Sequence, residues 1–125
     1  MNKQQITALV IKFVIIGVIS VIILPMFGRI TSGQALIAAL VLTLVAYFAG
    51  DIGILPRYGN VTATVVNVII AALVIGVADW SINGIITLDV TGWVLALVLI
   101  AAGEWFFHRY LKTTPIPAGD APKEE

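Results

Sequence analysis

The sequence predicts an all-α fold: an integral membrane, antiparallel four-helix bundle with spans at about residues 6–27, 35–54, 61–78 and 92–110. Composition is the first observation behind this prediction. Of the 125 residues, 60% are hydrophobic and 11% are charged, whereas a soluble domain typically has about 25% charged residues. The second observation is that the apolar residues fall into four runs, each near the roughly 20 residues that a helix needs to cross a bilayer.

The first apolar run, residues 6–27, follows a short polar start that contains Lys3 and is interrupted only by Lys12. A charged start before an apolar stretch is also typical of a signal peptide, but a small-residue cleavage site is lacking and further apolar runs follow. We therefore expect a retained first span. Lys12 lies within two turns of its start, where its long side chain can extend toward the headgroups.

The second run, residues 35–54, follows the turn residues of 28–34 and leads into the central polar interruption, GDIGILPRYGN at residues 50–60. Helices usually stop before the residue that precedes a proline, so Pro56 limits this span and Asp51 falls in its last turn. Asn60 is a candidate N-cap of the next span. The predicted hinge motif between the two spans consists of Gly50, Pro56, Gly59 and Asn60.

The third run, residues 61–78, carries Asn67, and the fourth, residues 92–110, closes with GEWFFHRYL. Residues 79–91 lie between them, with an Asn83-Gly84 turn signal, and are predicted to form the longest loop. Residues 1–112 are thus expected to form one four-span transmembrane domain. Residues 113–125 contain three prolines and mixed charge, so a disordered cytoplasmic tail is predicted there.

The basic residues are distributed unevenly over the two sides of this bundle. With a cytoplasmic N-terminus, the cytoplasmic segments hold six of the seven basic residues and the outside holds only Arg29. The positive-inside rule then predicts a multi-pass protein of the bacterial cytoplasmic membrane with both termini cytoplasmic. The six cytoplasmic residues are Lys3, Lys12, Arg57, Arg109, Lys112 and Lys123.

Several polar side chains of the runs share one depth. At 1.5 Å per residue, Lys12, Asn67 and Glu104 lie roughly 9 to 10 Å from the cytoplasmic ends of their spans. Charged groups at such depth usually face the bundle interior and find partners there. We expect Lys12 to pair with Glu104, or otherwise with Asp51, and Arg57 to hold Asp51. The candidate polar cluster comprises Lys12, Asp51, Arg57, Asn67, Glu104 and His108.

Each part of this cluster has a structural and a functional interpretation. His108 follows Glu104 by one helical turn, so the two share a face and could relay a proton, although such a pair more often anchors a helix end. Asn67 is expected to fix helix register through an interhelical hydrogen bond. The pair of Asp51 and Arg57 is expected to act as a local lock of the hinge.

Signatures of enzymes are lacking in the sequence. One histidine and no cysteine do not supply the ligands of an ordinary zinc site, and nucleophile elbows, phosphate loops and GxGxxG are lacking. We therefore predict no catalytic residue, no cofactor and no metal site. The net charge of zero gives no field that attracts nucleic acid. The expected partners are the lipid bilayer and either a further copy of the chain or another membrane protein.

Three stretches, GDIGILPRYGN, the following TATVVN, and GEWFFHRYL, resemble the YndM-like family, small four-span membrane proteins of Gram-positive spore-forming bacteria without an assigned activity. The resemblance covers most of residues 12–110 and implies fold and location, not chemistry. Where this chain has Asn67, the family often has an acidic residue, which weakens a proton-carrying role at that position. The residues that match the family pattern are Gly50, Asp51, Ile54, Leu55, Pro56, Arg57, Gly59, Asn60, Glu104, Phe107 and His108.

Three functions are compatible with these features. We favour a structural or interaction role in the cytoplasmic membrane, because a conducting path needs polar residues along its length and the outer halves of the spans are almost entirely apolar. The alternative is a small transporter or channel subunit with a cytoplasm-facing polar pocket. A third possibility is a regulatory partner of a larger membrane complex that docks through the hinge.

Overall fold

The computed structural model describes residues 3–113, and these residues are helical apart from two short connections, with no strand among them. The predicted all-α class is confirmed. The tail predicted at 113–125 lies outside the described residues, except for Thr113 at the end of the last helix. The elements are α1 (Lys3–Phe27), α2 (Ser32–Val45), the π-helical segment η1 (Ala46–Ile54), α3 (Leu55–Asn83) and α4 (Val90–Thr113).

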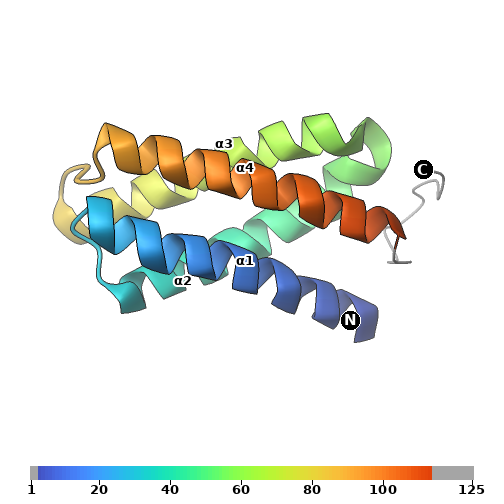
Figure 1. The fold of residues 1–125 in the computed structure, drawn as a ribbon, viewed down its shortest axis with the longest axis horizontal. Helices are drawn as coiled ribbons and strands as arrows, with labels where there is room; N and C mark the ends of the chain where they lie inside the picture. The colour runs from blue at the N-terminus through green and yellow to red at the C-terminus, as the bar shows by residue number, and fades with distance from the viewer. Residues whose placement is uncertain (1–2, 114–125) are drawn as a thin grey trace.

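The long helices lie side by side, and the chain reverses direction between successive ones (Figure 1). α1 contacts α2 and α4, and α3 contacts α2, η1 and α4, so the helices form a ring in chain order. The start of α1, the passage from η1 to α3 and the end of α4 lie at one end, the hinge end. The connections at residues 28–31 and 84–89 lie at the other, the loop end (Figure 1).

The reversal at the hinge end occurs within one continuous helical stretch, Ser32–Asn83, of 52 residues. Leu55 donates its N–H to the carbonyl of Gly50, five residues earlier, as in a π-helix. Pro56 lies in the first turn of α3, where its missing N–H costs no helical hydrogen bond. The break falls at Gly59, whose φ of 88° is readily adopted only by glycine. The helix therefore continues past Pro56, where the second span was expected to end, and the chain reverses at Gly59, a member of the predicted hinge motif.

Within residues 3–113, three helical stretches are long and apolar enough to cross a membrane by length and composition: Lys3–Phe27, Ser32–Asn83 and Val90–Leu111. Each helix turns one stripe of residues, four apart, inward and another outward. The outward stripe of α1 is aliphatic and 51% to 66% exposed, and consists of Ile6, Val10, Val14, Val18, Ile22 and Met26. The inward stripe of the same helix mixes small, polar and aliphatic residues: Ala8, Lys12, Ile16, Ser20 and Leu24.

The loop end is closed by Asp79, which was expected in the loop between the third and fourth runs. α3 instead continues to Asn83 and ends at Gly84, whose φ is 78°, a common way for a helix to end. Asp79 is buried. Its Oδ1 accepts from Asn83 Nδ2 (2.9 Å) and Thr87 Oγ1 (2.7 Å), and its Oδ2 accepts from the backbone N–H groups of Thr87 (2.7 Å) and Leu88 (2.9 Å).

The same groups join the two connections at this end. Thr87 Oγ1 accepts from the Arg29 backbone N–H at 2.8 Å, and Asn83 Nδ2 donates to the Arg29 carbonyl at 2.8 Å. Because Asp79 orients both Asn83 and Thr87, one carboxylate holds the α3–α4 connection against the α1–α2 connection.

We expect Asp79→Ala to lower the free energy of unfolding by about 2 to 4 kcal/mol, because four donors lose a buried acceptor. Chemical denaturation of the purified protein measures this loss. Asp89→Ala is the matched control. Asp89 is exposed and accepts one hydrogen bond, from the Gly92 N–H, so about 1 kcal/mol is expected. Equal losses in the two variants would contradict the role given to Asp79.

Candidate functional site

Five polar side chains meet inside the bundle near the hinge end, and each is at most 2% exposed. They come from α1, η1, α3 and α4, so every long helical stretch contributes. We call this set the buried network: Lys12, Asp51, Asn67, Glu104 and His108. All five belong to the candidate polar cluster expected from the sequence.

Lys12 links the two carboxylates of the network. Its Nζ donates to Asp51 Oδ2 and to Glu104 Oε1, each at 2.5 Å, and lies 4.9 Å from the ring centre of Phe107. Glu104 was the partner expected from the sequence, and the structure shows that Lys12 contacts Asp51 as well. An ammonium buried in a bundle is stabilised only when its charge is balanced and hydrogen-bonded, and these two carboxylates meet that need.

Asn67 joins the same two carboxylates from α3. Its Nδ2 lies 2.9 Å from Asp51 Oδ1 and 3.2 Å from both Glu104 Oε1 and His108 Nε2, so the amide contacts three members of the network. Gly50 makes this position possible. A Cβ at residue 50 would lie 2.7 Å from Asn67 Cγ and closer still to its Oδ1, so only glycine leaves room for the amide.

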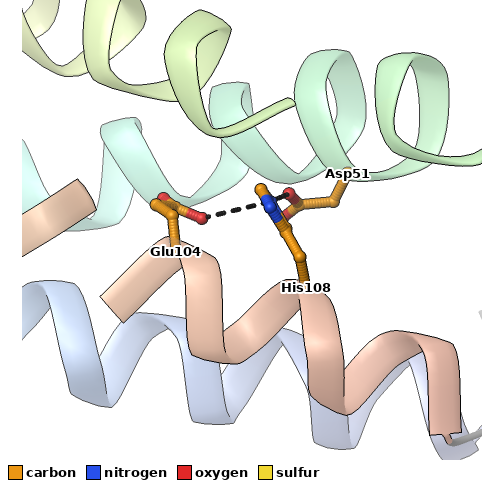
Figure 2. A group of neighbouring side chains, drawn as sticks. All are labelled: Asp51, Glu104 and His108. Carbon is orange, nitrogen blue, oxygen red and sulfur yellow. Dashed lines mark hydrogen bonds and ion pairs between the residues drawn. The ribbon is translucent and has the colours of Figure 1, made fainter. Parts of the chain in front are cut away.

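His108 extends the network toward the hinge end. Its Nε2 lies 2.6 Å from Asp51 Oδ1 and 3.6 Å from Glu104 Oε1. Its Nδ1 lies 2.7 Å from Asn60 Oδ1 and 3.2 Å from Thr64 Oγ1. Figure 2 shows Glu104 and His108 projecting from α4 toward Asp51 on η1. The imidazole thus bridges a fully buried carboxylate and a half-buried amide.

Asn60 and Thr64 form the outer layer of the site, and both are half-buried. Thr64 Oγ1 donates to Asn60 Oδ1 at 3.1 Å, and Asn60 Nδ2 donates to the carbonyl of Trp105 at 3.4 Å. Asn60 was expected to cap a helix, and its side chain links α3 to α4 here. Thr64 was not singled out from the sequence, although it lies one turn from Asn60 on the same helical face.

The prediction that Arg57 holds Asp51 is wrong. Arg57 is exposed, and its Nη1 donates to the Gly53 carbonyl at 3.5 Å. Side chains three or four residues apart share a helix face, whereas six residues separate Asp51 from Arg57, which places them on different sides. The four members of the hinge motif, Gly50, Pro56, Gly59 and Asn60, lie along the reversal between η1 and α3.

Three members of the network have the spacing of a metal-binding group. Asp51, Glu104 and His108 each offer a ligand atom within 4.8 Å of the others. Lys12 Nζ, however, already lies 2.5 Å from both carboxylates. A metal ion would have to displace this ammonium and overcome its charge, so the arrangement favours the lysine as the cation of the site.

A family model described as a protein of unknown function (DUF2512) matches residues 3–123. The chain belongs to the DUF2512 family. The match includes the whole buried network and the hinge motif, and it assigns no activity to the DUF2512 protein. No curated protein and no solved structure matches this DUF2512 chain.

We expect Lys12→Leu to destabilise the DUF2512 protein by about 3 to 5 kcal/mol, because two buried carboxylates lose their cation. The double variant Lys12→Leu with Glu104→Leu should be more stable than the single variant, since it removes one of the two unpaired charges. A double-mutant cycle in one detergent measures this coupling. Additive losses would show that Lys12 and Glu104 contribute independently.

Gly50→Ala is expected to destabilise by about 2 kcal/mol or more, because the new methyl group overlaps the Asn67 amide. Gly53→Ala lies in the same segment and is the control. Its Cβ would meet the nearest atom, the Phe48 carbonyl oxygen, at an ordinary 3.6 Å. Thermal unfolding of both variants measures the difference, and a larger loss for Gly53→Ala would contradict the packing described here.

Proposed function

We propose that the chain is a multi-pass integral protein of the bacterial cytoplasmic membrane with a non-catalytic, structural or interaction role. The outward stripes support the membrane location. On α3 the outward stripe again consists of large aliphatic residues more than half exposed: Val61, Val65, Ile69, Leu73 and Val77. Apolar surface of this extent is unfavourable in water and favourable in lipid.

Four spans follow from the length of the central stretch. Ser32–Asn83 contains 52 residues, about 78 Å of straight helix, whereas the hydrocarbon core of a bilayer is about 30 Å thick. The break at Gly59 divides this stretch into two arms that run side by side (Figure 1). Each arm is long enough for one crossing, so α1, α2 with η1, α3 and α4 would cross the membrane in alternating directions.

The distribution of basic residues supports a cytoplasmic hinge end. In the proposed orientation six of the seven Lys and Arg residues are cytoplasmic, which is the bias that sets orientation in such proteins. Both chain termini are then cytoplasmic. We also propose, from the hinge sequence GDIGILPRYGN, that the chain groups with the YndM-like proteins of Gram-positive spore-forming bacteria.

The buried network is the observation that carries the structural role. The Lys12 ammonium donates hydrogen bonds to the Asp51 and Glu104 carboxylates, so these charges are paired across three helical elements. Such a closed arrangement fixes helix register, because any shift would leave a charge unpaired in a medium of low dielectric constant. A bundle locked in this way would serve as a rigid platform for a second copy of the chain or another membrane protein.

A small transporter with a cytoplasm-facing site is the second candidate. A series of hydrogen-bond contacts from half-buried Asn60 through His108 to Asp51 favours it, because these contacts connect the buried network to the hinge end. Proton flux into vesicles that contain the protein distinguishes the two. Flux equal to that of empty vesicles is expected for the structural role. Flux that is abolished by His108→Gln would overturn that role in favour of transport.

The topology is tested with reporters fused after Glu125 and inserted after Gly84. We expect cytoplasmic activity for the first fusion, which follows four crossings, and external activity for the second, which follows three. An odd total number of crossings would instead place the end of the chain outside. Solubility of the purified chain without detergent would contradict the membrane location itself. Reporters that both face the cytoplasm would contradict four spans.

A further inference from the structure

We propose that the buried network is a proton-binding site, with His108 as a doubly protonated imidazolium, and that the bound proton exchanges only with the hinge end. The proposal rests on the proposed membrane bundle and assigns that bundle a ligand. Geometry at His108, the charge count of the network and the surroundings of the network support it in turn.

Both ring nitrogens of His108 face oxygen acceptors. Nε2 lies 2.6 Å from Asp51 Oδ1, and the Asp51 carboxylate acts as an acceptor because its two oxygens also accept from Asn67 Nδ2 and Lys12 Nζ. Nδ1 lies 2.7 Å from Asn60 Oδ1, which is an acceptor because the Asn60 Nδ2 donates to a backbone carbonyl. A neutral imidazole has one N–H and would leave one of these close contacts without a hydrogen. An imidazolium satisfies both.

The charge count gives the same result. When both carboxyls are ionised, Asp51 and Glu104 contribute two negative charges against the one positive charge of Lys12, and all three groups are buried. A neutral His108 would leave a net negative charge inside the bundle, whereas an imidazolium makes the network neutral. Because an uncompensated charge is costly at this depth, the network stabilises the extra proton.

The groups that face His108 come from every element packed around it. η1 contributes the carboxylate of Asp51 and α4 contributes the carboxylate of Glu104, while the Lys12 ammonium of α1 contacts these same two carboxylates. η1 also carries a second titratable group, the buried hydroxyl of Tyr47. The groups from α3 are uncharged: Asn60, Thr64 and Asn67.

The surroundings of the network differ on its two sides. Toward the hinge end, His108 leads directly to half-buried Asn60 and Thr64. Toward the loop end, the residues one turn further along α1, α3 and α4 are apolar and at most 1% exposed: Ile16, Ala71 and Ile100. A proton can therefore pass along hydrogen bonds to the hinge end, and it meets an apolar layer in the other direction.

The protonation state is tested by ¹⁵N NMR of the reconstituted full chain labelled at histidine. The chain has a single histidine, so its two ring signals need no assignment. Two protonated nitrogens at neutral pH are expected. One protonated and one unprotonated nitrogen would overturn the proposal. Asp51→Asn removes one negative charge and is expected to give a neutral ring, whereas Ser20→Ala, a buried polar position nearer the loop end, is expected to keep the imidazolium.

The side of exchange is tested with membrane vesicles of both orientations and a buffered lumen. Making only the outer solution alkaline is expected to abolish the imidazolium signal in inverted vesicles, which expose the hinge end, and to spare it in right-side-out vesicles. Loss of the signal in both orientations would overturn one-sided exchange. Failure of the membrane bundle is distinguishable, because the chain would then be missing from both kinds of vesicle.

Discussion

The architecture depends on one interaction, the ammonium of Lys12 held between the carboxylates of Asp51 and Glu104. No solvent reaches this pairing, since each side chain is at most 2% exposed. A positive charge on α1 therefore needs η1 and α4 in place at once, and both carboxylates need α1. Each buried charge is paired only when the other helices are in place, so this mutual requirement gives the ring of helices its specificity.

The two ends of the bundle are closed by the same kind of chemistry used in different ways. At the hinge end, the carboxylates meet a lysine, an amide and an imidazole from distant parts of the chain. At the loop end, Asp79 gathers donors from residues that follow it closely in sequence. The first arrangement depends on helix packing, and the second depends on a single local connection.

Much of this site could be predicted from the sequence, because the level of a residue along a helix is found by counting residues from the helix end. Lys12, Asn67 and Glu104 lie at one level for that reason, and Asp51 joins them. The partner of Asp51 was predicted wrongly, since residue counting gives depth but not the direction around the helix axis. The inward position of Asp51 depends on the π-helical geometry of η1, which hydropathy does not reveal. Asp79 was missed because the Asn83-Gly84 turn ends α3 later than the polar residues suggested.

The π-helical geometry of η1 has a consequence for how this segment can change over evolutionary time. Successive residues of an α-helix are rotated by about 100° around the helix axis, so adding or removing one residue changes the direction of the side chains that follow. An insertion or deletion between Ala46 and Asp51 would rotate the Asp51 carboxylate away from Lys12, which would then keep only Glu104 as its partner. Substitutions on the outward face of η1 leave that geometry intact. The length of this segment is therefore under stronger constraint than most of its side chains.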